Sequence, residues 1–306
     1  MIVVSAELVQ ATLGRLGEEG AEWLRRLPEL VEEYAARWSL EIGPPLPANY
    51  SFVAPADRED GTRAIIKVNR VERENVHEGE ALRTYAGKGA VLLHEADPQA
   101  GVLLLEQCEP GTTLAEAVPD DEEATAIAAT VLRRLWRPVE PGHPFERAAD
   151  RAREWSASIL SDFAAMGRPF ERKLAEQASG LFAELADSSD ESFLLHQDFH
   201  HYNVLSAQRE AWLAIDPKPI VGERAFDIGA FLRNPGPEIL SMPDPKAFTA
   251  RRIDRFAAEL ELDRGRITGW ALAQAVELGL WSLSVGERQW GEWEIACAEL
   301  LAALID

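Results

Sequence analysis

LLHQDFHHYNVL, residues 194–205, is the most informative stretch of this 306-residue chain. It places three histidines and one aspartate between two apolar runs that are short enough to be strands. Three interpretations are open at this point: a metal site, a catalytic loop, or a polar bend between two strands.

A zinc site is the least favoured of the three. His196 and His200 are four residues apart, but Gln197 stands where zinc hydrolases with this spacing have a glutamate. No cysteine is close in the sequence, and a third protein ligand would still be needed.

The spacing of oxygen-bearing side chains favours a catalytic loop. Asp198 and Asn203 are five residues apart, and Asp216 follows after the apolar run WLAI. Magnesium prefers a few protein oxygens together with phosphates and water. Asn203 and Asp216 can supply those oxygens, and Asp198 can stay off the metal beside an acceptor hydroxyl. The protein-kinase template has the same H-x-D-x-x-x-x-N loop, followed by a metal-binding aspartate.

A lysine in an apolar run offers a complementary group. AIIKV, residues 64–68, places Lys67 in the middle of an expected strand, where a buried ammonium needs anions. Nucleotide phosphates and a carboxylate of the next helix, from Glu78 or Glu80, would satisfy it. A lysine that points to solvent from an edge strand is the alternative.

Hydrophobic periodicity predicts an α+β protein with a small, antiparallel-sheet N-terminal lobe and a large, mainly helical C-terminal lobe. We place the boundary at the turn Glu109-Pro110-Gly111, so that the domains are residues 1–108 and 109–306. Extra helices over residues 6–38 precede the sheet, and Pro28 is expected to start or kink the second of them. The expected strands of the first lobe are 50–56, 62–68, 91–97 and 101–108, with a helix at 72–85. The expected helices of the second are 120–136, 147–166, 170–186, 245–260, 264–285 and 287–305, with short strands between 193 and 216.

Composition limits the partners. A net charge of −21 argues against nucleic acid, which requires a basic face. The acidity either gathers cationic substrates or only keeps helix surfaces soluble. The chain shows no secretory signal, no membrane-length apolar run and only two cysteines, which predicts a cytoplasmic, reduced protein without a membrane partner. The oligomeric state stays open.

Together these segments resemble the aminoglycoside phosphotransferase branch of the protein-kinase-like fold, and specifically the streptomycin and hydroxyurea resistance kinase family. The resemblance runs from about Tyr50 to Pro235 and is most specific from His196 onward. The segments that carry it are HQDFHHYNVL (196–205), WLAIDPKPIVGERAFDIGAFLRNP (212–235), LLLEQCEPGTTL (103–114) and HEGEALRTYAGKGAVLL (77–93).

The resemblance implies a role for each matched residue. Asp198 would be the catalytic aspartate, and Asn203 and Asp216 would hold Mg²⁺. Lys67 would contact the phosphates of ATP or GTP and pair with Glu78, whose distance to Gly87 fits the family's helix length better than that of Glu80. The hinge would lie at Glu106, Gln107 and Cys108. His196 and Asp227 would be structural residues that support the catalytic loop.

Two features depart from the family pattern. Gln197 replaces the glycine that usually follows the loop histidine, which restricts the backbone of the loop. The segment NYSFVAPADREDG, residues 49–61, lacks a glycine-rich phosphate loop, so backbone groups of residues 49–53 would have to cover the phosphates. Lys218 either adds positive charge near the phosphates or lies on the surface.

The expected reaction is in-line transfer of the γ-phosphoryl group to an alcohol of a cationic small molecule, with streptomycin as the acceptor that the family suggests. The alternatives are a metabolic kinase acting on a sugar or amino alcohol, and a nucleotide-binding protein without turnover. The C-terminal helices carry tryptophans and glutamates that would suit a guanidinium or ammonium group, or that simply form core and solvated surface. These residues are Trp270, Trp281, Trp290, Trp293, Glu277, Glu287, Glu292 and Glu294.

Overall fold

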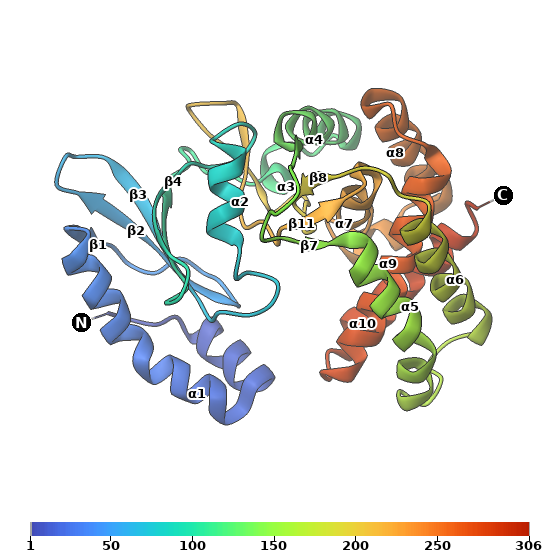
Figure 1. Cartoon of the computed structure of the whole chain (residues 1–306), viewed down its shortest axis with the longest axis horizontal. Coiled ribbons are helices and arrows are strands. Elements are labelled where there is room, and N and C mark those ends of the chain that lie inside the picture. The colour runs from blue at the N-terminus through green and yellow to red at the C-terminus, as the bar shows by residue number, and fades with distance from the viewer. Residues whose placement is uncertain (1, 306) are drawn as a thin grey trace. The chain divides into compact units, whose positions relative to one another are not determined.

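The computed structural model describes residues 2–305, so the outermost residues of the two expected domains, Met1 and Asp306, lie outside it. The chain forms two compact units, of which the first ends at Gly111 and the second begins at Thr112. The expected α+β architecture, with an antiparallel sheet followed by a mostly helical region, is confirmed (Figure 1).

The first unit is built on a five-stranded antiparallel sheet of order β1-β2-β3-β5-β4. Strand β2 alternates between half-buried and buried residues from Ser51 to Ala56, whereas β3 is buried at every position from Ile66 to Asn69. The strands are β1 (Leu40–Ile42), β2 (Ser51–Arg58), β3 (Arg63–Asn69), β4 (Leu93–Asp97) and β5 (Val102–Glu106).

Helix α1 (Ala6–Arg37) lies along one face of this sheet (Figure 1). Its apolar residues, among them Leu27 and Val31, form a buried cluster with Ile66 and Val68 of β3. Pro28 does not start the second helix, because it lies inside α1. The backbone leaves helical geometry at Gly17, with φ of 54°, because glycine adopts this conformation without a Cβ clash.

Helix α2 (Glu78–Tyr85) is shorter than the helix expected over residues 72–85. Asn75 explains the difference, because its side chain accepts a hydrogen bond from the Glu72 backbone N–H at 2.9 Å and donates to the Arg70 carbonyl at 2.9 Å. Such local bonds compete with helical hydrogen bonds. The chain therefore turns before the helix begins, and Glu78 stands in its first turn.

Helix α9 lies at the centre of the second unit and is buried on several faces. Its Trp270 packs against Phe182 in the core. A helix that is apolar nearly all round belongs in a protein interior. The helices of this unit are α3 (Leu114–Ala117), α4 (Asp121–Leu135), α5 (Ala148–Ala165), α6 (Arg172–Asp187), α7 (Ile228–Leu232), α8 (Pro245–Leu260), α9 (Arg264–Ser284) and α10 (Arg288–Ala302), with 3₁₀ turns at Arg224–Asp227 and Pro237–Ser241.

Two small sheets hold the central loops of the second unit. One is a hairpin of β9 and β10, and the other has the order β6-β8-β11-β7. The two-residue strands β6 and β7 and the strand β11 were not predicted, because such short segments show no periodicity. The strands are β6 (Arg137–Pro138), β7 (Glu146–Arg147), β8 (Phe193–Leu195), β9 (Val204–Ser206), β10 (Trp212–Ala214) and β11 (Ile220–Gly222). Within residues 2–305, no helix has both the length and the apolar character that a membrane span requires.

Candidate active site

Lys67 lies in the interior of the first unit, paired with the helix glutamate. It belongs to β3, and its ammonium is 2.8 Å from Oε1 and 3.0 Å from Oε2 of Glu78. Both residues are buried, at 5% and 1% exposure. Removing either partner would cost a buried ion pair, which is strongly destabilising. Between the two glutamates considered from the sequence, Glu78 is the one that Lys67 contacts.

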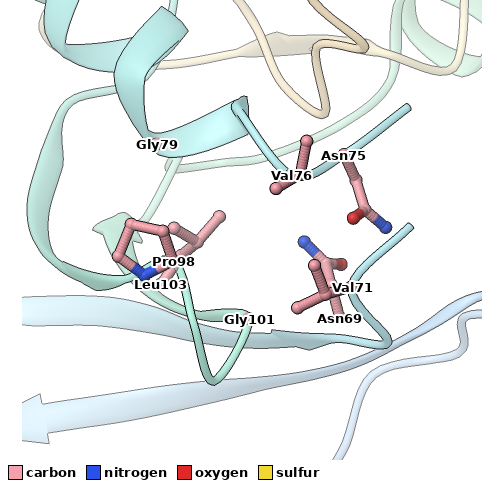
Figure 2. Close-up of a pocket in the computed structure, with 8 residues that line it drawn as sticks. All are labelled: Asn69, Val71, Asn75, Val76, Gly79, Pro98, Gly101 and Leu103. Atoms are coloured by element: carbon pink, nitrogen blue, oxygen red, sulfur yellow. The ribbon is translucent and has the colours of Figure 1, made fainter. Parts of the chain in front are cut away.

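Asn69 completes this cluster and was missed in the sequence. Its side-chain N–H donates to Glu78 Oε2 at 2.7 Å. The spacing of two residues from Lys67 was the available signal, because residues i and i+2 of a strand share a face. Figure 2 shows Asn69 and Asn75 beside a hollow with Gly79 and Leu103. Its volume of about 10 Å³ is enough for one water molecule and far too small for a nucleotide.

The expected hinge follows β5. Gln107 and Cys108 are half-buried, and the peptide bond from Glu109 to Pro110 is cis. Gly111 has φ of 74°, and a Cβ at this position would lie 2.8 Å from the Cys108 carbonyl oxygen. The chain therefore turns tightly after Cys108, and glycine is required for that turn.

In the second unit, the loop between β8 and β9 is fixed by a buried carboxylate. Asp227 accepts backbone N–H bonds from His196 at 3.0 Å and from Gln197 at 2.6 Å. It also accepts the indole N–H of Trp136 at 2.9 Å. His196 in turn bonds through its ring Nε2 to the Ile215 carbonyl at 2.8 Å. Asp227 and His196 therefore hold the loop from two sides; Trp136, distant in sequence, gave no signal of this role.

The departure from the family glycine has a structural consequence. Gln197 adopts a left-handed backbone conformation with φ of 65°. A non-glycine residue pays about 1–2 kcal/mol in this region, which explains why a glycine is usual there. The short hydrogen bond from its N–H to Asp227 holds Gln197 in this conformation.

Asp198 lies between two cationic or polar neighbours. Its Oδ2 is 3.0 Å from the Lys218 ammonium, and its Oδ1 is 3.6 Å from His200 Nε2. Burial alone would raise the pKa of Asp198, but Lys218 and then His200 outweigh it and hold the pKa well below its usual range. Burial lowers the pKa of His200, and Asp198 opposes this effect. Asp198 is therefore an anion beside the Lys218 ammonium, and it is a weak base.

Asn203 and Asp216 stand at the same end of the β9–β10 hairpin. Val204 pairs with Ala214, and the Ile215 N–H donates to the Asn203 carbonyl at 2.9 Å. The Asn203 amide N–H donates to the Asp198 carbonyl at 2.9 Å, which orients its amide oxygen away from that carbonyl. An amide oxygen and a carboxylate are the ligands that Mg²⁺ accepts beside phosphates, so the donor set fits this ion. In residues 2–305, no group of three or more His, Cys, Asp or Glu could hold a metal on its own.

The tryptophans of the C-terminal helices divide into two groups. Trp270 and Trp293 are buried, and Trp270 donates to Glu223 at 2.9 Å, whereas Trp281 and Trp290 are 41% and 51% exposed. Glu294 is buried, and its carboxylate lies 2.9 Å from Arg233 Nε. Burial raises the pKa of Glu294 to about 7; Arg233 opposes this effect and Asp198 adds to it.

Comparison with known proteins agrees with this geometry. The model of the aminoglycoside/hydroxyurea antibiotic resistance kinases matches residues 37–286. The chain belongs to this family. Kinases of this kind transfer a phosphoryl group from a nucleotide, so the chain is a nucleotide-using phosphotransferase.

Several relatives are close enough to align over nearly the whole chain. Streptomycin 6-kinase of Streptomyces griseus is 36% identical over 94% of this chain and 92% of its own length. Hydroxyurea phosphotransferase of Kitasatospora aureofaciens is 33% identical over 98% of this chain and 86% of its own. Among solved structures, choline kinase LicA of Streptococcus pneumoniae superposes with a TM-score of 0.63 at 17% identity, covering 91% of this chain and 99% of that one. A complex of aminoglycoside phosphotransferase APH(4)-Ia with ADP and hygromycin B superposes with a TM-score of 0.62 at 13% identity, covering 89% and 97%. These structures share the fold.

Proposed function

We propose that this kinase transfers the γ-phosphoryl group of ATP or GTP to a hydroxyl of a streptomycin-like aminoglycoside and thereby inactivates it. The observation that carries this proposal is the 36% identity to a streptomycin 6-kinase over 94% of the chain. The arrangement of Asp198, Asn203 and Asp216 around one loop is consistent with it.

Each residue has a role in the proposed reaction. Lys67, oriented by Glu78, contacts the nucleotide phosphates, and backbone groups of Gln107 and Cys108 bind the purine edge. Asn203 and Asp216 hold Mg²⁺, which neutralises charge on the phosphates when it is bound.

Asp198 positions the acceptor in this scheme. As the phosphorus–oxygen bond to the acceptor forms and the bond to the nucleoside diphosphate breaks, the hydroxyl proton passes to Asp198 late in the step. A carboxylate with a depressed pKa is too weak a base to remove this proton early. Asp227 and His196 keep Asp198 in place through the loop backbone, so most of the rate enhancement comes from positioning.

The charge of the chain supports a cationic acceptor. A net charge of −21 attracts guanidinium and ammonium groups. We propose a cytoplasmic location for the enzyme, where the nucleotide donors are found. We also propose the domain boundary at residues 108–109, three residues before the boundary of the two compact units, so that the hinge ends the first domain.

The decisive experiment measures acceptor-dependent release of nucleoside diphosphate. The purified protein is incubated with MgATP or MgGTP and, separately, streptomycin, hygromycin B, hydroxyurea, choline or a hexose. We expect turnover with streptomycin and its loss in Asp198→Ala. Asp190→Ala, an exposed aspartate between α6 and β8, is the matched control and keeps full activity.

Hydroxyurea is the second candidate acceptor, because a hydroxyurea phosphotransferase is 33% identical over 98% of the chain. Turnover with hydroxyurea alone would select this function. Turnover only with choline or the hexose would replace both proposals by a metabolic kinase, and tight nucleotide binding without any transfer would replace them by a binding protein.

A further inference from the structure

Lys218 is fixed beside Asp198 by the backbone on which it stands. Its N–H donates to the His196 carbonyl at 3.0 Å, and buried Pro217 separates it from Asp216. Asp216 itself has a left-handed backbone with φ of 58°. The backbone of Lys218, which lies between β10 and β11, is therefore bonded to the catalytic loop at His196, and its ammonium lies 3.0 Å from Asp198 Oδ2.

Stability gives little reason for this contact. The side chains of Lys218 and Asp198 are 37% and 30% exposed, and an ion pair of this kind contributes at most about 1 kcal/mol to folding. Arg172 and Arg288 also form exposed ion pairs, with Glu176 and Glu292. What distinguishes Lys218 is that its partner is the carboxylate proposed to face the acceptor hydroxyl.

The chemistry of transfer places negative charge next to this ammonium. The acceptor oxygen lies against Asp198, and the phosphorus approaches that oxygen in line, so the equatorial phosphoryl oxygens pass close to any cation that touches Asp198. An ammonium presents three N–H donors and can contact a carboxylate and a phosphoryl oxygen together.

We propose that Lys218 is a catalytic residue, whose ammonium holds Asp198 toward the acceptor and contacts the transferred phosphoryl group. In this step the acceptor oxygen forms a bond to phosphorus, and the bond from phosphorus to the bridging oxygen breaks with its electrons leaving on the nucleoside diphosphate. The hydroxyl proton goes to Asp198 and then to solvent. Lys218 stays protonated throughout and stabilises charge as a fixed cation.

The proposal rests on the phosphotransferase function above, so its test uses two acceptors. Lys218→Ala and Lys218→Arg are assayed in the full-length protein with MgATP, both with streptomycin and for basal hydrolysis, in which water is the acceptor. We expect kcat of Lys218→Ala to fall about 100-fold for both acceptors, with KM for MgATP and for streptomycin within about threefold of wild type. Lys218→Arg retains the charge and keeps more of the activity, and the exposed Lys173→Ala in α6 is the matched control.

Chemical rescue distinguishes a direct role of the Lys218 ammonium from a structural effect of its removal. Added methylammonium should raise kcat of Lys218→Ala in a saturable manner, and it should leave Asp198→Ala unchanged. A kcat within threefold of wild type, a change in KM alone, or a loss that methylammonium does not restore would overturn the role of Lys218. Nucleotide hydrolysis by the wild type without transfer to streptomycin would instead overturn the proposed acceptor. In that case the role of Lys218 is tested by the hydrolysis rates of its variants. Absence of both reactions in the folded wild type would overturn both proposals.

Discussion

Replacing Asp227 by asparagine tests whether one buried carboxylate fixes the catalytic loop. The carboxylate accepts three N–H groups, two on Oδ2 from His196 and Trp136 and one on Oδ1 from Gln197. An amide has a single oxygen. If that oxygen keeps the two bonds at the Oδ2 position, the new NH₂ group meets the Gln197 N–H, and two donors then face each other.

The expected cost follows from this geometry. Losing one hydrogen bond to a charged acceptor costs about 1.5–3 kcal/mol, and leaving the Gln197 N–H buried without an acceptor adds about 1 kcal/mol or more. We therefore expect Asp227→Asn to lower the free energy of unfolding by about 3 kcal/mol. Gln197 also loses the bond that holds its left-handed backbone, so the loop relaxes and kcat falls.

Urea titration followed by tryptophan fluorescence measures the first effect. Of the nine tryptophans only Trp23 and Trp38 precede residue 112, so the signal reports mainly on the second unit. Asp190→Asn makes the same chemical change on the surface and should stay within about 0.5 kcal/mol of wild type. An Asp227→Asn protein with wild-type stability and kcat would refute the reasoning.

Three further changes have defined outcomes. Lys67→Met should remove the ammonium that lies 2.8 Å from the buried Glu78 carboxylate, lower the unfolding free energy by about 3 kcal/mol in urea titration, and weaken nucleotide binding measured by calorimetry. Gln197→Gly should relieve about 1–2 kcal/mol of backbone strain, and the greater entropy of the unfolded chain should cost up to about 1 kcal/mol. The free energy of unfolding of this variant should therefore equal or exceed that of wild type. A loss above about 1 kcal/mol would show that the Gln197 backbone is not strained. The Glu294 pKa of about 7 exceeds its value of 4.5 in the unfolded chain, so its contribution to stability is full below pH 4.5 and is lost as the pH rises through 7. The unfolding free energy of Glu294→Gln minus that of wild type should accordingly increase between pH 5 and pH 8, by about 3 kcal/mol at most. A difference that does not change with pH would show that the pKa of Glu294 is not raised.

Removal of the divalent ion provides a test of the metal ligands. Excess EDTA should abolish transfer, and Mg²⁺ should restore it. Asn203→Ala should raise the Mg²⁺ concentration required for half-maximal activity, because one of two protein oxygens is lost. An unchanged Mg²⁺ requirement in this variant would remove Asn203 from the metal site.

The family and the fold class could be read from the sequence, and so could the close spacing of Asp198, Asn203 and Asp216, whose catalytic and metal-binding roles stay predictions. Loop spacing was sufficient because Asp198 and Asn203 are local, and because strand ends bring Asp216 to the same edge. The α+β architecture followed from local patterns, since the alternation of β2, the apolar run of β3 and the apolar face of α1 are properties of consecutive residues.

The tertiary structure alone determined that Lys218 meets Asp198 and that Arg233 meets Glu294. Lys218 was equally consistent with a surface lysine until its ammonium was found 3.0 Å from Asp198. The bond from Trp136 to Asp227 joins residues 91 positions apart, and the pairing of Glu294 with Arg233 joins α10 to the residue that follows α7. Sequence periodicity reports which face of an element is buried, but contacts between distant elements depend on how those elements pack, and that arrangement is a property of the whole folded unit.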